Sequence, residues 1–426
     1  MRGLLYQAAL AAALAALLVQ TSASAEDRET VTVSERYGRS CRGSVDGLPF
    51  LVLRGTHRER GEAHGFLGAR EIIKTCDAMA GVVSGMGGPE AKGAGWEAAK
   101  TLVRRFRFPE RFQDELQGMM DGIRKALPDP GDRMLKATGA EITMEDLEVL
   151  QCGDVLELMR CSQFSAWGAL TADGGTIIGR NWDYPPIFPF DTYCVFAVEP
   201  VEEGLQKTID AMWFGMIGAG MGCLNEEGVY VSGNDAGSED PSKVQFPVPA
   251  ALAVRMTAET ARAGNALAAI GENIDQKTAL AILYHVVAPP GGQDQAERAF
   301  VFEYAPGVTS PIETRVRRSP STLPEALIVA NDPLIGKGGG GESSGRYESI
   351  EKALSNPETR GRLDFERARA ILDAVAASSP TLTTQYSAVV WPGRKELRIA
   401  VAPAPGQAAT KQEYARVRWG ELFGTR

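Results

Sequence analysis

The cysteines and histidines of this chain limit the chemistry that it can perform. The 426 residues include six cysteines but only three histidines, which are His57, His64 and His285. No HExxH or HxxH pattern occurs among the histidines, and no CxxC pattern among the cysteines, so the sequence predicts no metal site. A Ser-His-Asp hydrolase is not expected either, because no GxSxG motif is followed by a usable histidine. We expect His57 and His64 to be surface or packing residues.

Cys161 is the residue best placed to act as a nucleophile without a histidine. Another group must then accept its proton, and a free α-amino group qualifies because its unperturbed pKa is about 8. Cys161 follows Leu158-Met159-Arg160 at the point where a predicted helix gives way to a strand. Cleavage after Arg160 would make Cys161 a new N-terminus that carries both the nucleophile and the base. The alternative is a buried structural cysteine.

The N-terminus has the pattern of an export signal. Arg2 precedes an apolar run over residues 4–19, and Ala23-Ser24-Ala25 forms a small-residue cleavage signal before Glu26. The run is shorter than the roughly 20 apolar residues that span a bilayer. We therefore expect residues 1–25 to be removed and the chain to be exported, either to the periplasm or out of the cell, without an integral membrane span. The alternative is an uncleaved amphipathic anchor.

Charge and cysteine content narrow the partners and the covalent links. The formal net charge is −9 and no basic run is present, which argues against nucleic acid and anionic membranes as partners. Some cysteines of an exported protein can pair, and Cys41 with Cys76 is the first candidate, although the sequence does not determine the connectivity.

The spacing of apolar residues predicts a largely helical segment before Cys161 and a β-rich one after it. Before Cys161, we expect short strands in Thr30–Arg54 and helices over Glu59–Val83, Gly95–Ala126 and Thr143–Met159. After it, strands are expected over Phe164–Leu170, Thr176–Arg180, Thr192–Val198, Thr208–Ile217, Gly228–Ser232, Phe300–Glu303, Ala326–Ala330, Tyr386–Trp391 and Leu397–Ala402. Helices are expected over residues 249–285 and Glu366–Ala377, and a mobile loop over Gly336–Gly341. This pattern predicts an α/β fold in which helices cover antiparallel sheets.

Several motifs resemble one known family. Residues 161–168 (CSQFSAWG), Ala172-Asp173-Gly174-Gly175 and Gly179-Arg180-Asn181-Trp182-Asp183 look like the start of the mature subunit in the acyl-coenzyme A:6-aminopenicillanic acid acyltransferase family. This peptidase C45-type family of N-terminal nucleophile hydrolases is related to the choloylglycine hydrolases and penicillin V acylases. Further similar stretches are Glu59–Gly65, Gly215–Gly218, Leu224–Asn234, Ala330–Pro333 and Ser343–Tyr347. The chain departs from the family at Arg160, where Gly is frequent, and at Asp332, where His is.

The resemblance implies a fold, a maturation step and a reaction. The fold would be the four-layer αββα fold, and self-cleavage would leave residues 26–160, a largely helical pro-segment, bound to the catalytic residues 161–426. The mature enzyme would hydrolyse linear amides of small molecules or short peptides, or transfer their acyl group, without a cofactor. A lipid amidase or phospholipase-B-like ester hydrolase, and a non-catalytic binding protein with the same fold, are the alternatives.

The resemblance also assigns roles near the nucleophile. Arg180 would lower the pKa of the Cys161 thiol, and Asp183 would accept hydrogen bonds from the new α-ammonium group. The alternative for Arg180 and Asp183 is an ordinary ion pair at a strand end. Arg346 matches a family arginine beside the nucleophile, and its alternative is a solvated charge beside the glycine-rich loop.

Two asparagines and several aromatic residues complete the expected site. Asn234 and Asn331 would donate hydrogen bonds to the oxyanion, although Asp235 is the neighbouring choice to Asn234, and both asparagines suit ordinary turns. An apolar substrate pocket would be lined by four aromatic residues, whose alternative is the hydrophobic core. These are Trp167, Tyr184, Phe188 and Trp213.

Overall fold

The computed structural model describes residues 31–85, 94–153, 160–219, 222–236, 244, 247–289, 298–320, 322–335 and 345–425. The predicted export signal in residues 1–25 and the predicted loop Gly336–Gly341 lie outside these ranges. Within them, the structure has no helix with the length and apolar character that a membrane span requires.

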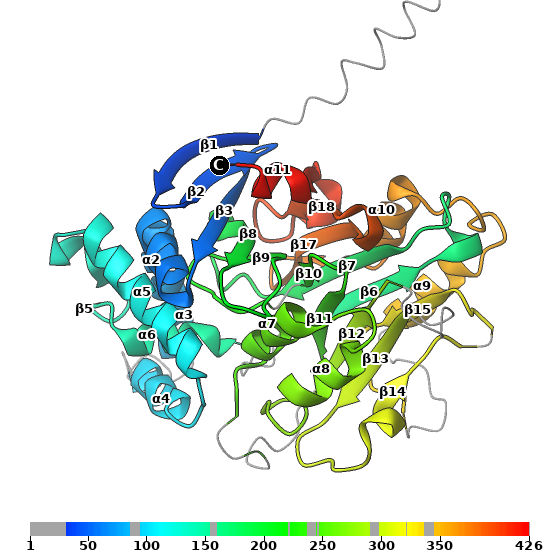
Figure 1. The fold of residues 1–426 in the computed structure, drawn as a ribbon, viewed down its shortest axis with the longest axis horizontal. Coiled ribbons are helices and arrows are strands. Elements are labelled where there is room, and N and C mark those ends of the chain that lie inside the picture. The colour runs from blue at the N-terminus through cyan, green and yellow to red at the C-terminus, as the bar shows by residue number, and fades with distance from the viewer. Residues whose placement is uncertain are drawn as a thin grey trace, which may run out of the picture.

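Most strands belong to two large sheets (Figure 1). The ten-stranded sheet consists, in spatial order, of β1 (Val31–Tyr37), β2 (Ser40–Val45), β3 (Leu48–Gly55), β8 (Tyr193–Pro200), β9 (Thr208–Trp213), β10 (Cys223–Asn225), β11 (Tyr230–Asp235), β12 (Ile282–Val287), β13 (Ala299–Tyr304) and β14 (Val316–Arg317). The seven-stranded sheet consists of β15 (Ala326–Val329), β6 (Arg160–Ala166), β7 (Ile177–Tyr184), β17 (Leu382–Trp391), β18 (Glu396–Val401) and β19 (Ala415–Arg418), with β16 (Ser378–Ser379) paired to β17. Among the described strand pairs, only β3 with β8 is parallel. The short pair β4 (Met134–Leu135) and β5 (Ala140–Glu141) is separate.

The helices fall into two groups along the chain. The segment before Cys161 contains α2 (His57–Leu67), α3 (Ala69–Gly85), α4 (Ala94–Val103), α5 (Glu110–Ala126) and α6 (Met144–Gln151). The segment after it contains α7 (Ala250–Thr260), α8 (Ala266–Asn273), α9 (Arg346–Leu354), α10 (Phe365–Ala374) and α11 (Trp419–Phe423). A capping box of Thr143 and Asp146 begins α6, at the start of the helix expected from Thr143, and it satisfies free N–H groups of the first turn.

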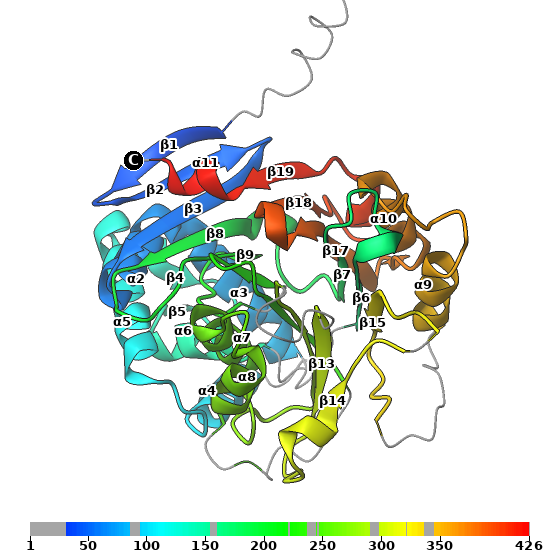
Figure 2. The same ribbon diagram turned by 45° about the vertical axis from the view of Figure 1, so that its right-hand side comes forward.

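The two large sheets contact each other and carry helices (Figure 2). Strand β6 packs against β11 of the other sheet. On the ten-stranded sheet, α7 packs against β10 and β11, whereas α9 and α10 pack against β15, β7 and β17 of the seven-stranded sheet. The chain is therefore a mixed α/β protein, in agreement with the expected class.

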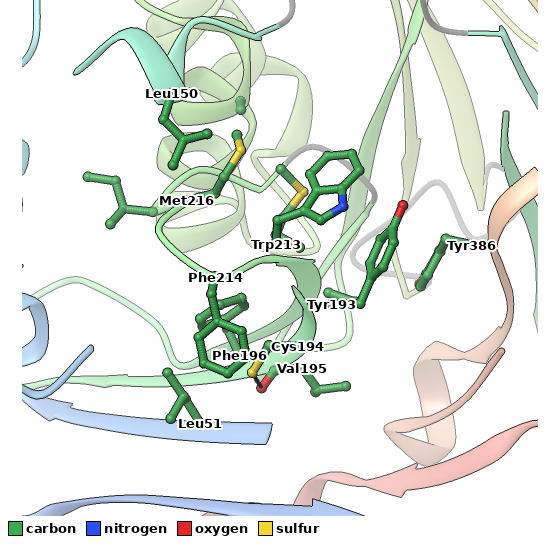
Figure 3. Packing of buried hydrophobic residues seen from close by; sticks show 14 of the residues in the cluster. Leu51, Leu150, Tyr193, Cys194, Val195, Phe196, Trp213, Phe214, Met216 and Tyr386 are labelled. Atoms are coloured by element: carbon green, nitrogen blue, oxygen red, sulfur yellow. Dashed lines mark hydrogen bonds between the residues drawn. The ribbon is translucent and has the colours of Figure 1, made fainter. Parts of the chain in front are cut away.

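The segment before Cys161 and the segment after it share one sheet and one core. Strand β3 pairs with β8, and α2 packs on β3 and along α5. Figure 3 shows Leu51 and Leu150, from the first segment, beside Phe196, Trp213 and Met216 of the second. The pieces expected from cleavage after Arg160 are thus joined by sheet hydrogen bonds and by buried apolar contacts.

Some expectations from the sequence are wrong in detail. The helix expected over residues 249–285 ends at Asn273, and Ile282–Val287 forms strand β12, because its β-branched and aromatic residues suit a buried strand. The strand expected over Phe164–Leu170 ends at Ala166, and the one over Thr208–Ile217 ends at Trp213. The Cys41–Cys76 disulfide, the first candidate from the sequence, is absent: no disulfide joins any of the six cysteines, which are all buried, and Cys41 lies on β2 whereas Cys76 lies on α3.

Candidate active site

Cys161 is the second residue of strand β6 and is fully buried, whereas Arg160 before it is exposed. Side chains of a strand alternate between the two faces of its sheet. Gln163 donates to Asn234 at 3.0 Å and Ser165 bonds to His285 at 3.0 Å, so this set of side chains faces the ten-stranded sheet. Cys161 is two residues before Gln163, so its thiol lies on the same face of β6, between the two sheets.

Arg180 on β7 provides the positive charge beside the thiol. Its Nη2 atom lies 3.8 Å from Cys161 Sγ and donates to the Gly233 carbonyl at 2.8 Å, while Nη1 donates to Asn234 Oδ1 at 2.8 Å. Burial raises the pKa of the Cys161 thiol to about 11, although Arg180 and Arg346 oppose this rise. The thiol is therefore protonated near neutral pH in this structure, and a base would be needed to turn it into a thiolate.

The backbone of Cys161 is held by Asn331 and Arg346. Its N–H donates to Asn331 Oδ1 at 3.0 Å, and its carbonyl accepts from Arg346 Nη1 at 2.7 Å. Arg346 Nη2 also donates to Asn331 Oδ1 at 2.7 Å, and Asn331 Nδ2 donates to the Asp235 carbonyl at 2.6 Å. The atom that cleavage would turn into an α-amine thus already has a fixed hydrogen-bond acceptor.

Asp183 lies beside the beginning of β6, on the face of the seven-stranded sheet opposite to the Cys161 thiol. It is the cross-strand neighbour of Arg160, and it accepts a hydrogen bond from the Thr384 hydroxyl at 2.5 Å. Arg346 Nη1 lies 3.6 Å from its carboxylate. Burial raises the pKa of Asp183 to about 6, while Thr384, Arg346 and Arg180 oppose the rise. Arg180 and Asp183 therefore flank the end of β6 on opposite faces.

Asn234 anchors Arg180 in this structure. Its Oδ1 accepts from both Gln163 and Arg180, and its Nδ2 donates to the Ala330 carbonyl at 2.8 Å. For the oxyanion role expected of Asn234, its side-chain N–H group would have to turn from the Ala330 carbonyl toward a substrate. Sequence reasoning missed Gln163, which also accepts from Ser232 at 2.8 Å. The sequence could have indicated Gln163, because Gln163 and Ser165 are polar residues at alternate positions of a strand that is otherwise apolar and buried.

An apolar cavity lies next to this group of residues. Tyr184, Phe188 and Trp213 line it, as expected, but Trp167 does not. Trp167 instead precedes the turn Gly168–Leu170, and its backbone N–H donates to Glu325. Trp182, the cross-strand neighbour of Cys161, also lines the cavity and was missed.

Gly233 connects the cavity with the residues around Cys161. Gly233 lines it and accepts the hydrogen bond from the Arg180 group that touches the thiol. Gln151 and Gly153, from the segment before Cys161, form another part of the wall. In the described part of the chain, no three His, Cys, Asp or Glu side chains gather in a way that could hold a metal ion.

Comparisons with known proteins find structural neighbours only. No protein-family model and no curated protein matches the sequence. Two mutant forms of the conjugated bile acid hydrolase from Clostridium perfringens align with 12% identity over 62% of this chain and 95% of theirs, with TM-scores of 0.37 and 0.38. Penicillin V acylase from Agrobacterium tumefaciens aligns with 10% identity over 57% of this chain and 84% of its own, with a TM-score of 0.30. At these values the likeness assigns neither a family nor an activity.

Proposed function

We propose that this chain is an N-terminal nucleophile amidohydrolase that cleaves itself between Arg160 and Cys161 and then uses Cys161 to break linear amide bonds. Residues 26–160 would remain bound to residues 161–426 in an αββα fold. The substrate would be a small molecule or a short peptide, and the acyl group would pass to water or to another acceptor. We further propose that residues 1–25 direct export to the periplasm or out of the cell.

One observation carries the proposal. Directly after the exposed Arg160, the Cys161 thiol lies 3.8 Å from Arg180 and its backbone nitrogen lies 3.0 Å from Asn331 Oδ1. These partners are far apart in the sequence and contact the two atoms of Cys161 that such a mechanism uses. A buried structural cysteine has no need of a guanidinium group at its thiol and of a side-chain acceptor at its nitrogen.

In the maturation step, the thiol of Cys161 would attack the carbonyl carbon of Arg160. The C–N bond between the two residues breaks, a thioester forms, and the nitrogen of Cys161 takes up a proton to become the α-amine. Water then hydrolyses the thioester, which leaves a carboxylate on Arg160 and returns the thiol. Arg346, bound to the Cys161 carbonyl, and Asn331 would hold the backbone in place during this step.

In the mature enzyme, the α-amine of Cys161 would accept the thiol proton and pass it to the leaving amine. The thiolate forms a thioester with the substrate acyl group, and water or another acceptor resolves it. Arg180 would stabilise the thiolate, Asp183 and Asn331 would bind the α-ammonium, and Asn234 or Asn331 would turn an N–H toward the oxyanion.

Intact mass measurement and N-terminal sequencing of the purified protein test the proposal without a substrate. We expect two pieces, the second of which begins Cys161-Ser162-Gln163. A single chain that begins near Glu26 would contradict self-cleavage and favour a binding protein with this fold. A preference for long acyl chains or for esters in a later activity screen would favour the lipid amidase or ester hydrolase.

A further inference from the structure

A network of buried side-chain hydrogen bonds connects strand β11 with the Cys161 thiol. Ser232 Oγ donates to Gln163 Oε1 at 2.8 Å, and Gln163 Nε2 donates to Asn234 Oδ1 at 3.0 Å. The same oxygen of Asn234 accepts from Arg180 Nη1 at 2.8 Å, and Arg180 Nη2 lies 3.8 Å from Cys161 Sγ. All five side chains are fully buried, where β6 and β7 of one sheet face β11 of the other (Figure 1). The positive charge beside the thiol is thus connected to Gln163 through a single amide group.

The chemistry of these groups fixes the direction of every hydrogen bond in the network. A guanidinium group can only donate, so the atom of Asn234 that faces Arg180 must be the oxygen. Gln163 contacts this same oxygen, so it must present its N–H group to Asn234 and its own oxygen to Ser232. Reversing the Gln163 amide would place two oxygens against each other. A side chain without an N–H group at this position therefore interrupts the network.

Few other contacts hold the Arg180 guanidinium group. The Gly233 carbonyl accepts from Nη2 at 2.8 Å, and the Trp182 ring centroid lies 5.4 Å from the guanidinium carbon. The Nε atom of Arg180 has no hydrogen-bond partner among the described residues. Gly233 and Asn234 are neighbours on β11. The position of the charge therefore depends on β11 and on the orientation of the Asn234 amide.

The Asn234 amide also contacts the segment that holds the Cys161 backbone. Its Nδ2 donates to the Ala330 carbonyl at 2.8 Å. Ala330 directly precedes Asn331, whose side-chain oxygen accepts from the Cys161 N–H at 3.0 Å. One amide group thus connects the support of the thiol with the support of the nitrogen.

We propose that Gln163 is a positioning residue of the reaction at Cys161: through Asn234, it holds the Arg180 guanidinium group against the thiol. The inference rests on the proposed function, because it adds a residue to the machinery of the same site. A positive charge favours the thiolate only while it stays close, since the interaction between two charges weakens with their distance. The N–H group of Gln163 keeps the Asn234 oxygen turned toward Arg180, and so keeps this charge in place.

Two replacements in the purified full chain test the role by the rate of self-cleavage, followed by intact mass. Gln163→Met keeps the side-chain length but has no N–H group, and we expect roughly tenfold slower cleavage. Ser232→Ala leaves the Gln163 oxygen without its donor, and we expect a smaller loss, roughly threefold. Ser165→Ala is the matched control, because Ser165 is equally buried on the same face of β6 but bonds to His285 instead. It should be cut at the natural rate.

The serine pair keeps the test decisive if Gln163→Met does not fold. Equal cleavage rates in Ser232→Ala and Ser165→Ala would overturn the inference. So would a natural rate in a folded Gln163→Met chain.

A double-mutant cycle distinguishes positioning of Arg180 from a general effect on the fold. If Gln163 acts through Arg180, Gln163→Met should cause little further loss in the Arg180→Lys chain, where the planar guanidinium group is already gone. A merely structural role would slow cleavage by the same factor in both backgrounds, and that result would overturn the inference.

Crystal structures separate this inference from the proposed function. The Cys161→Ala chain with and without Gln163→Met compares the same uncut state. We expect the 2.8 Å hydrogen bond between Arg180 and Asn234 to be lost when Gln163→Met is added. An unchanged hydrogen bond would overturn the positioning role. A natural chain that remains uncut would contradict the proposed function, whereas this structural comparison would still decide whether Gln163 positions Arg180.

Discussion

The backbone N–H of Cys161 donates to the side-chain oxygen of Asn331, 3.0 Å away and 170 residues further along the chain. The same oxygen accepts from Arg346, whose guanidinium group also binds the Cys161 carbonyl. Both backbone polar groups of Cys161 therefore have long-range side-chain partners, although a residue at the beginning of a strand normally uses its sheet neighbours. In the proposed maturation, the new α-amine would be formed beside an acceptor that is already in place.

Replacing the nucleophile should stop both proposed steps. We expect Cys161→Ala to remain a single chain by mass spectrometry and to lose amide hydrolysis. Cys161→Ser should slow cleavage and turnover, because a hydroxyl is the poorer nucleophile near neutral pH. Cys76→Ala is the control, since Cys76 is equally buried but lies on α3 away from this site. Cleavage that persists in Cys161→Ala would rule out self-processing.

Arg346→Lys should slow self-cleavage while the fold is kept. Arg346 reaches two acceptors at once, the Cys161 carbonyl and Asn331 Oδ1, and an ammonium group cannot reproduce this planar geometry. Loss of one hydrogen bond to a charged group costs about 1.5–3 kcal/mol, or roughly 10- to 100-fold in rate. The rate is measured by following the uncut chain on gels after expression. Arg367→Lys, on the exposed part of α10, should cleave at the natural rate, and equal rates in both variants would contradict the assigned role.

The fold class could be predicted from the sequence where the apolar pattern was regular. Strand β17 and the capping box before α6 follow from local residue types, which act over a few neighbours. The prediction of a helix over residues 249–285 is wrong at Ile282–Val287. This short apolar run follows alanine-rich helices, and its pattern fits a buried strand as well as a helix. The pairing of β3 with β8 could not be predicted, since it joins strands far apart in the chain and leaves no local signal.

The candidate site, too, could be predicted only where it does not depend on contacts between strands that are distant in the sequence. Cys161, Arg180 and Asp183 could be named from the sequence because they lie in motifs that resemble a known family, and β6–β7 pairing brings them together. The cavity-lining role of Trp182 follows from its place opposite Cys161, which requires the strand register. Trp167 has the same residue type but lies after the end of β6 and does not line the cavity. Residue type alone therefore does not distinguish a pocket aromatic from a core aromatic.

Asp183 should make the folded state sensitive to pH in a defined direction. Burial raises the pKa of Asp183 from 3.8 to about 6. The unfolded chain therefore releases this proton at lower pH than the folded chain. Its contribution to stability is present below about pH 4 and is lost as the pH rises through about 6, by at most about 3 kcal/mol.

The variant Asp183→Asn removes this titration. Because the pKa of about 6 applies to the uncut chain, the measurement uses the Cys161→Ala chain. We expect its free energy of unfolding, from urea titrations at pH 4, 5, 6 and 7, to fall less with rising pH when Asp183→Asn is added. Asp173→Asn is the comparison, because the Asp173 side chain is partly exposed and its pKa is lowered, so its effect should have the opposite sign. Parallel pH profiles of the Cys161→Ala chain with and without Asp183→Asn would show that the Asp183 carboxyl does not titrate in this range.

Gln151 should control substrate binding from the segment before Cys161. Its side chain donates to the Gly215 carbonyl at 2.9 Å and accepts from the Ile217 N–H at 2.8 Å, and Met216 between them lines the cavity. Gln151→Leu leaves both backbone groups without this partner, so we expect the loop to shift and KM to rise about tenfold with a smaller change in kcat. Gln113→Leu, outside the cavity, should leave both constants unchanged. An equal fall of kcat in both variants would indicate general destabilisation instead.

The buried ion pair between Glu115 of α5 and Arg255 of α7 should hold the two segments together. Arg255 Nη1 lies 2.8 Å from Glu115 Oε1, and both side chains are almost fully buried. Burial opposes ionisation of Glu115, but Arg255 and His57 outweigh it and hold the pKa of Glu115 well below its usual range. Arg255→Met leaves the Glu115 carboxylate buried without this partner, which costs about 3–5 kcal/mol. Urea unfolding should show this loss. Adding Glu115→Gln should restore part of it, because the double variant no longer buries the Glu115 charge, while Glu259, which Arg255 also binds at 2.8 Å, still lacks this partner. If the double variant loses the sum of the two single losses, the two side chains do not act as a pair.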